Sequence, residues 1–328
     1  MKNTWILKDF KKDIWSFYMP GFLVALLIYF LRFSDDSTGL LVLAWISMGL
    51  LDSGHVYTTI WRTYLNPKEL LRKKNYYIRM PLIIFSLFFL WIYFKVPFLG
   101  AFIAYFTIYH NLRQFYGMSK WYQKINQSFD KISDKFLYLL SFVSLAAAHF
   151  RSDLEWTKYY PGAGGFIYPS HFYEHLMRMV FFVLFGCWVL YEYYKAYRNK
   201  KFEVPRILSV VYPVALYAYC FMYAKNLQGV LFPLIVSHGL SYFILIGVSV
   251  KKTKVLKTQI GVILGIFLMA AVLGSLEFFF EEYTSFLYSG SMLGISLSAL
   301  ALTPLFCHYI YDAFLWRSDH PETKVIMS

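Results

Sequence analysis

Apolar runs of about 20 residues recur along the whole chain, and this repetition restricts the fold more than any other feature. The hydrocarbon core of a bilayer is crossed by a helix of roughly 20 apolar residues. Charged residues make up only 16% of the chain, whereas a soluble domain of this size would need a far larger polar shell. The sequence therefore predicts an all-α protein, a polytopic integral membrane helical bundle in which residues 1–328 form one domain.

Ten transmembrane helices are expected in this bundle. The spans follow the apolar runs: Trp15–Phe33, Leu40–Arg62, Arg79–Val96, Phe98–Met118, Leu137–Phe150, His171–Tyr194, Arg206–Tyr223, Gln228–Val250, Thr258–Phe280 and Ser291–Trp316.

Basic residues gather at the N-terminus and in every second loop, while acidic residues gather in the other loops. Cytoplasmic loops carry the excess of Lys and Arg in membrane proteins. This alternation predicts that both termini are cytoplasmic and that the protein lies in the cell inner (cytoplasmic) membrane. The net charge of +13 is then explained by contact with anionic lipid headgroups, and no nucleic-acid partner is expected.

Three segments outside the spans have their own character. Residues 1–14 mix lysines with large apolar side chains, which predicts an interfacial amphipathic helix. Residues 119–135 have the same texture and predict a cytoplasmic interfacial segment. Residues 151–170 are rich in Gly, Pro and aromatic residues, which favours an outer-side loop or lid packed against protein.

Several histidines and aspartates lie inside the predicted spans, most of them at a similar depth. Ionisable groups are costly in lipid, so they usually face the interior of the bundle and have a function there. Imidazole is a common nitrogen ligand of iron, copper and zinc. The sequence therefore predicts one intramembrane metal site. The expected metal is iron, and zinc or a haem group are the alternatives. The expected metal ligands are His55, His110, His238 and His308.

Two carboxylates are spaced to act with these histidines. Asp312 follows His308 by four residues, and Asp52 precedes His55 by three, so each pair projects from one side of a helix. Such a carboxylate can ligate the metal or orient a histidine through its second ring nitrogen. We therefore expect Asp52 and Asp312 to be the catalytic residues. The alternatives stay open, because isolated histidines also serve as packing residues and Asp–His pairs also form proton relays in transporters.

A second group of histidines is expected near the outer surface. His149 ends one predicted span, and His171 and His175 lie one turn apart at the start of the next. An HxxxH spacing can bind a metal. Glu174 and Arg178 are also one turn apart, however, which fits a helix-stabilising ion pair equally well.

At these residues the chain resembles the multi-histidine integral membrane oxygenases. The type nearest in size and span count is the Brp/Blh β-carotene dioxygenase, which also distributes isolated histidines among membrane helices. That family has a histidine–glycine signature, followed by Asp-His, early in the chain, and the most similar segment here is Asp52-Ser-Gly-His55. The HxxHH boxes of fatty-acid desaturases are absent from this sequence. The resemblance extends over the architecture of most of the chain.

Three functions fit the sequence. The first is a metal-dependent oxidoreductase with non-haem iron, whose substrate is an apolar lipid or isoprenoid and which would need a redox partner. The second is a bis-histidine haem protein for electron transfer. The third is a transporter or receptor with a polar core inside the membrane and no enzymatic activity.

Overall fold

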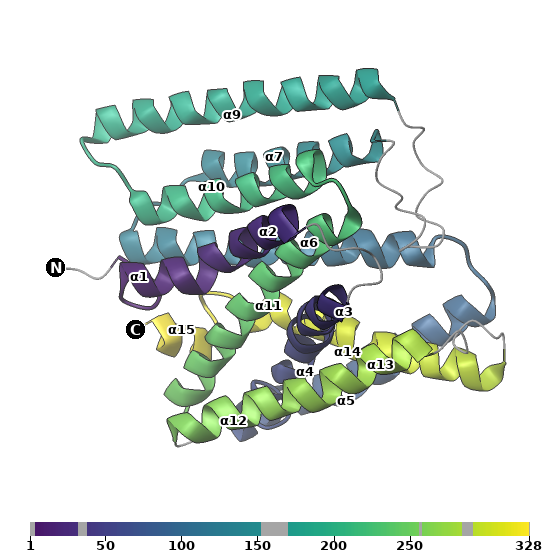
Figure 1. Ribbon diagram of the computed structural model, residues 1–328. Helices are drawn as coiled ribbons and strands as arrows, with labels where there is room; N and C mark the ends of the chain where they lie inside the picture. The colour runs from purple at the N-terminus through teal and green to yellow at the C-terminus, as the bar shows by residue number, and fades with distance from the viewer. Residues whose placement is uncertain (1–3, 32–37, 152–169, 256–257, 284–290, 328) are drawn as a thin grey trace. The chain divides into compact units, whose positions relative to one another are not determined.

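The computed structural model describes residues 4–31, 38–151, 170–255, 258–283 and 291–327, and all regular structure in these ranges is helical (Figure 1). The predicted all-α class is therefore confirmed. The chain forms two compact units, each assembled from separate stretches of sequence. The first comprises residues 1–32 and 98–234, and the second comprises residues 33–97 and 235–328.

The first unit contains the N-terminal helices and the middle of the chain. Its helices are α1 (Phe10–Asp13), the π-helix η1 (Ile14–Tyr18), α2 (Met19–Leu31), α6 (Leu99–Asn126), α7 (Lys131–His149), α9 (His171–Asn199), α10 (Val204–Ala218), the π-helix η5 (Tyr219–Tyr223) and the first residues of α11 (Leu227–Lys252).

The second unit contains the remainder of α11 and the other helices. These are α3 (Thr38–Ala44), the π-helix η2 (Trp45–Ser53), α4 (Gly54–Thr58), the 3₁₀ turn η3 (Thr59–Trp61), α5 (Pro67–Tyr93), α12 (Gln259–Met269), the π-helix η6 (Ala270–Gly274), α13 (Ser275–Tyr283), α14 (Met292–Leu315) and α15 (Pro321–Met327).

Seven helical stretches in the described residues are long and apolar enough to cross a membrane. They are Phe10–Phe30, Thr38–Trp61, Pro67–Tyr93, His171–Asn199, Val204–Tyr223, Leu227–Lys252 and Met292–Leu315. These stretches indicate a multi-pass membrane protein, as predicted. The other three predicted spans overlap α6, α7 and the α12–α13 run, which are not among the seven. The count of ten, the cytoplasmic termini and the inner membrane stay predictions.

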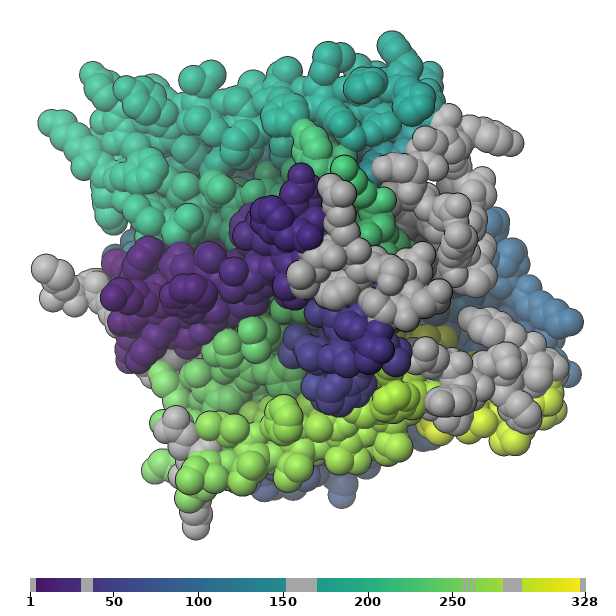
Figure 2. Space-filling view, viewed as in Figure 1, coloured from purple at the N-terminus to yellow at the C-terminus, as the bar shows by residue number. Residues whose placement is uncertain are grey.

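Helix α9, teal in Figure 2, exposes a series of large apolar side chains. They include Phe172, Met179, Phe182, Val183, Val189, Leu190, Tyr193 and Tyr197. A continuous series of exposed large apolar side chains along one helix is rare on soluble monomers. The lipid-facing side of a membrane helix has this composition. The side chains of α9 therefore agree with its length in indicating a membrane span.

In the first unit, a buried ion network joins the ends of α7, α9 and α10. The Arg206 guanidinium donates to both carboxylate oxygens of Glu192, at 2.6 and 2.5 Å, and its Nε donates to Glu203 at 2.9 Å. Its Nη1 also donates to Asp130 at 3.2 Å. The Arg206, Glu192 and Asp130 side chains are all almost fully buried. A buried charge is tolerated when it is paired and hydrogen-bonded in this way, so the network fixes the three helix ends.

Asp130 is also the N-cap of α7, because its side chain accepts from the backbone N–H groups of Ile132 and Ser133. Lys195 donates to it at 2.7 Å. Burial raises the pKa of the Asp130 carboxyl, but the hydrogen bonds from Lys195 and Ser133, together with the charges of Lys195 and Arg206, lower it to about 2. Asp130 therefore carries its negative charge throughout the neutral range.

In the second unit, glycines allow η2, η6 and α11 to approach one another closely. A Cβ added at Gly274 would lie 2.7 Å from the backbone nitrogen of Gly54, and closer still to the carbonyl oxygen of Gly49. A Cβ at Gly239 of α11 would meet the carbonyl group of Leu51. Small residues allow membrane helices to pack at short distance. These contacts bring the stretch around His55 against α11.

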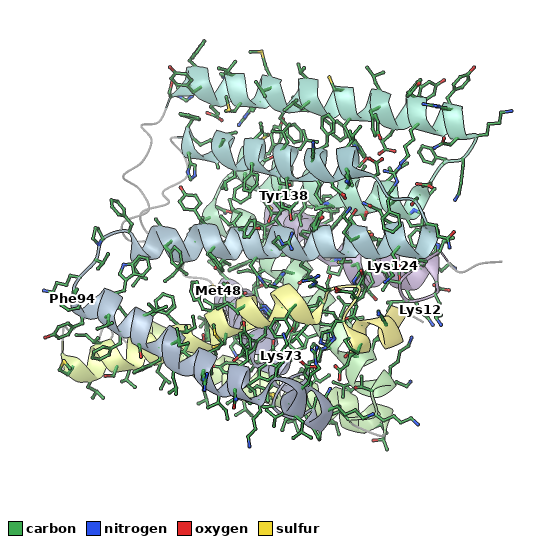
Figure 3. All side chains as sticks on the ribbon, turned by 180° about the vertical axis from the view of Figure 1, so that it is seen from behind. Lys12, Met48, Lys73, Phe94, Lys124 and Tyr138 are labelled. Carbon is green, nitrogen blue, oxygen red and sulfur yellow. The ribbon has the colours of Figure 1, made fainter. Side chains whose placement is uncertain are left out.

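Helices α5 and α14 pack along each other in the same unit. The backbone of α5 departs from helical angles at Lys73 (φ −137°, ψ 31°), which is labelled in Figure 3. The Lys73 ammonium lies 3.7 Å from the centre of the Phe314 ring. Tyr64, which precedes α5, donates to the Tyr77 carbonyl oxygen at 2.6 Å and contacts the Tyr311 hydroxyl at 3.1 Å. These contacts fix the α14 segment that carries His308.

The predicted segments outside the spans differ from the helices observed there. Within residues 1–14, helix begins only at Phe10 and continues into α2, because buried Asp13 accepts from the backbone N–H groups of Ile6 and Leu7 and holds the preceding residues in a turn. Residues 119–135 contain the end of α6 and the start of α7 rather than a helix of their own. The loop or lid expected at residues 151–170 lies almost entirely outside the described residues.

Candidate metal centre

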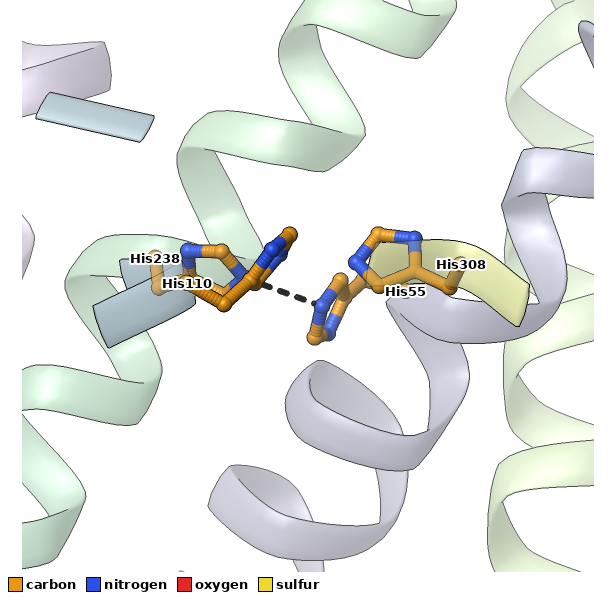
Figure 4. Close-up of side chains that lie close together, drawn as sticks. All are labelled: His55, His110, His238 and His308. Carbon is orange, nitrogen blue, oxygen red and sulfur yellow. Dashed lines mark hydrogen bonds between the residues drawn. The ribbon is translucent and has the colours of Figure 1, made fainter. Parts of the chain in front are cut away.

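Three buried histidines of the second unit, His55, His238 and His308, form a group that could hold a metal ion (Figure 4). They are three of the four ligands predicted from the sequence. One ring nitrogen from each lies within 4.8 Å of the other two. His110 belongs to the first unit. The geometry of the site is therefore built from the three histidines of the second unit.

The His55 ring lies between the other two rings of the second unit. Its centre is 4.6 Å from that of His238 and 4.8 Å from that of His308, and both ring pairs are nearly perpendicular. The Nε2 atoms of His55 and His238 are 3.0 Å apart and form a hydrogen bond, the dashed line in Figure 4.

The local helix geometry determines which nitrogen His55 offers. At the end of η2 the Gly54 N–H still bonds to the Gly49 carbonyl, and regular α spacing begins at Gly54. Such π segments interrupt the regular ladder and often occur at functional sites. The Nδ1 of His55 lies 2.7 Å from the Leu51 carbonyl oxygen, which can only accept. Nδ1 therefore carries the proton, and Nε2 presents its lone pair.

Hydrogen bonds determine the tautomer of His308 in the same way. The Tyr242 hydroxyl donates to Asp312 Oδ1 at 2.9 Å. Its oxygen lies 2.8 Å from the Thr59 hydroxyl, so Thr59 must be the donor of that bond. The Thr59 oxygen is 2.7 Å from His308 Nδ1 and can then only accept, so Nδ1 donates. His308 is left with an unprotonated Nε2, the form of imidazole that binds metals.

The distance between His55 and His238 suits two ligands of one metal ion. With metal–nitrogen bonds of about 2.1 Å, two nitrogens at a right angle are about 3.0 Å apart, and two at the tetrahedral angle are about 3.4 Å apart. The observed 3.0 Å is the length of a hydrogen bond, and it lies within the range over which His55 and His238 could hold one ion between them.

The two predicted carboxylates lie beside the histidines, with different contacts from those expected. Asp312 Oδ2 is 3.7 Å from His308 Nε2, and Asp52 Oδ1 is 4.0 Å from His55 Nδ1. Both distances exceed a hydrogen bond. Asp312 instead acts on His308 through Tyr242 and Thr59, while Nδ1 of His55 is bonded to the Leu51 carbonyl.

His110 is buried on α6 of the first unit, with 8% of its surface exposed. The neighbouring residue Asn111 donates to the Leu234 carbonyl oxygen at 3.1 Å and accepts from the Tyr217 hydroxyl at 3.2 Å. Leu234 lies in α11, one turn before His238 along the same helix. The α6 segment that carries His110 is thus bonded to the first part of α11.

The second histidine group has structural contacts. The Nε2 of His149 lies 2.8 Å from the Tyr105 hydroxyl, and the His171 side chain is 81% exposed. Arg178 donates at 2.6 Å both to Glu174 and to the Met222 carbonyl at the end of η5. Within the described part of the chain, these histidines do not join a group with the spacing of metal ligands. Of the two interpretations left open, the contacts favour the ion pair.

Sequence reasoning missed two residues of the site, Thr59 and Tyr242. The signal was present: Thr59 follows His55 by four residues and Tyr242 follows His238 by four, the same one-turn spacing that separates Asp312 from His308. Each histidine of the second unit is thus followed by a polar side chain on the same face of its helix. Thr59 forms its hydrogen bond with His308 and not with His55, the histidine one turn before it. This choice depends on contacts between helices.

The chemistry of the centre follows from its own atoms: unprotonated Nε2 positions on His55 and His308, and His238 Nε2 directed at the first of them. Comparisons of the chain with family models, with curated proteins and with solved structures give no match.

Proposed function

We propose that this protein is an integral membrane metalloenzyme, an oxidoreductase that uses non-haem iron on an apolar lipid or isoprenoid substrate. His55, His238 and His308 of the second unit are the ligands in this proposal. The observation that carries the proposal is the group of three buried imidazoles whose nitrogens lie within 4.8 Å of one another, with unprotonated Nε2 atoms on His55 and His308. Iron would supply one-electron redox chemistry at this point.

The surroundings of the centre support an apolar substrate. The helices around it are apolar by composition, and lipid-binding pockets combine apolar walls with a few placed polar groups. The resemblance to multi-histidine membrane oxygenases points to the same substrate class. The polar side chains next to the histidines are Thr59, Tyr242 and Asp312, and they are occupied in orienting His308.

The hydrogen-bonded chain from His308 to Asp312 favours a second candidate, a proton-coupled transporter. Its members form a continuous series of hydroxyl and imidazole groups, and such series carry protons in membrane transporters. In that case the same histidines would bind no metal, so metal content separates the two functions.

Metal analysis of the detergent-purified chain tests the proposal. We expect about one iron per chain and only weak visible absorption, as for non-haem iron. A haem would instead give an intense Soret band. His308→Ala should lose the metal and should no longer form oxygenated products from a mixture of apolar lipids supplied with a chemical reductant. His175→Ala, which changes an exposed histidine of the first unit, is the matched control and should retain both. Wild-type protein without bound metal would favour the transporter.

Replacing Thr59 with valine should weaken metal binding about 10- to 100-fold, as expected for loss of a group that orients a ligand. Valine has the same shape but cannot accept from His308 Nδ1 or donate to Tyr242, so His308 is no longer held in one tautomer. A competition titration with a chelator measures the affinity. Thr58→Val is the matched control, because the buried Thr58 hydroxyl donates only to the His55 carbonyl of its own helix. Equal affinities of the two variants would contradict this role of Thr59.

A further inference from the structure

Arg62 lies directly after η3 and is buried, with only 1% of its surface exposed. Its Nη2 donates to the Leu315 carbonyl oxygen at 2.9 Å and to the Thr323 hydroxyl at 3.3 Å. Its Nε lies 3.7 Å from Glu322 Oε2. A buried guanidinium is costly unless an opposite charge and hydrogen-bond acceptors accompany it. Both the charge and one acceptor come from the C-terminal segment His320–Thr323, which contains the start of α15.

This C-terminal segment, His320–Thr323, is bound to the start of α5. Asn66 donates to the Glu322 carboxylate, and His320 contacts the Arg72 guanidinium and lies 3.4 Å from Glu69 Oε2. The Thr323 hydroxyl donates to the Leu315 carbonyl at 2.6 Å. Thr323 is fully buried and His320 nearly so. The segment is thus packed into the unit and does not form a loose tail.

Arg62 connects this segment to the metal centre through Trp316. The guanidinium carbon lies 4.0 Å above the Trp316 ring, and a cation over an indole face is attracted by the ring. The Trp316 Nε1 donates to Asp312 Oδ1 at 3.1 Å, the same oxygen that accepts from Tyr242. Arg62 therefore fixes the ring that holds Asp312, and Asp312 begins the chain that sets the tautomer of His308.

We propose that the C-terminal segment His320–Thr323 is a positioning element of the metal centre. It holds Arg62 by charge and hydrogen bonding, Arg62 holds Trp316, and Trp316 holds Asp312 in the orientation that leaves His308 Nε2 unprotonated. The inference rests on the proposed function, because it assigns these residues a role in metal affinity. A purely structural role would change the stability of the protein and leave the affinity of the folded protein unchanged.

The experiment measures two quantities on the full chain: the dissociation constant for Fe²⁺, by competition with a chelator, and the thermal unfolding midpoint of the metal-free protein. Thr323→Val removes the hydroxyl that Arg62 uses, and Glu322→Gln removes the charge. We expect each variant to bind Fe²⁺ about 10-fold more weakly. Thr323→Ser retains the hydroxyl and should restore the affinity to within about twofold of the wild type. Lys324→Ala, an exposed neighbour on α15, is the control and should match the wild type.

The outcomes separate this inference from the proposed function. If Thr323→Val and Glu322→Gln both bind Fe²⁺ with wild-type affinity, the inference is overturned, whether or not the unfolding midpoint is lower. The proposed metal centre is not affected by that result. Weak binding in Thr323→Ser as well would show that the hydroxyl is not the determinant, which also overturns it. A wild-type chain that binds no Fe²⁺ overturns the proposed function and this inference together. If Thr323→Val does not fold, Glu322→Gln and Thr323→Ser decide the result.

Discussion

Replacing Arg206 with alanine should lower the free energy of unfolding by about 3–5 kcal/mol, the usual cost of removing one partner from a buried ion pair. Without the guanidinium, Glu192 and Asp130 remain buried at the ends of α9 and α7 with their negative charges close together. Lys195 still neutralises Asp130, but Glu192 loses its bidentate partner. Chemical unfolding of the protein in detergent, followed by tryptophan fluorescence, measures the change.

Arg198→Ala is the matched control for this prediction, because Arg198 is an exposed arginine of α9, the helix that carries Glu192. Surface substitutions of this kind usually change stability by no more than about 0.5 kcal/mol. A loss of equal size in both variants would show that the Arg206 network contributes nothing beyond an ordinary surface charge.

Replacing Gly274 with alanine should destabilise the second unit by about 3 kcal/mol, at the upper end of the range for overpacking. The added methyl group would meet the backbone of Gly49 and Gly54. A backbone cannot rotate away as the end of a side chain can, so η6 and η2 must separate. Because His55 directly follows Gly54, the same separation should reduce metal binding. Thermal unfolding and metal content are measured on one preparation.

Gly186→Ala provides the comparison. A Cβ added at Gly186 of α9 meets nothing within 4 Å, and alanine is favoured over glycine in a helix by roughly 0.5–1 kcal/mol. This variant should therefore be as stable as the wild type or slightly more stable. If Gly274→Ala behaved in the same way, the close approach of η2 and η6 would not be a determinant of the fold.

The helical class and the presence of several membrane-spanning helices could be predicted from the sequence because both depend on local composition. A run of about 20 apolar residues satisfies its backbone in lipid only as a helix, wherever the neighbouring helices lie. The interruptions could not be predicted in this way. The π segments η2 and η6 follow no local sequence signal, and their glycines lie against other helices. At Lys73, where α5 departs from helical angles, the residue is not next to a proline.

The candidate ligands could also be predicted, since an imidazole within an apolar run is costly unless it has partners. Their partners could not. His55 Nδ1 donates a hydrogen bond to the backbone carbonyl of Leu51, and a pattern of side chains in the sequence does not predict such a backbone contact. Asp312 has the spacing to bind His308 directly, yet it acts through Tyr242 and Thr59, because those hydroxyls come from two other helices and lie between them.

The sequence by itself therefore determined an all-α membrane protein with buried histidines in its apolar helices, because hydrophobic length and the cost of polar groups in lipid act residue by residue. Only the tertiary structure decided which nitrogen each ring presents and that the segment with Thr323 supports the centre. Thr59 and His308 are 249 residues apart, and Arg62 and Thr323 are 261 apart. Hydrogen bonds over such separations depend on how helices pack, and no local pattern specifies that packing.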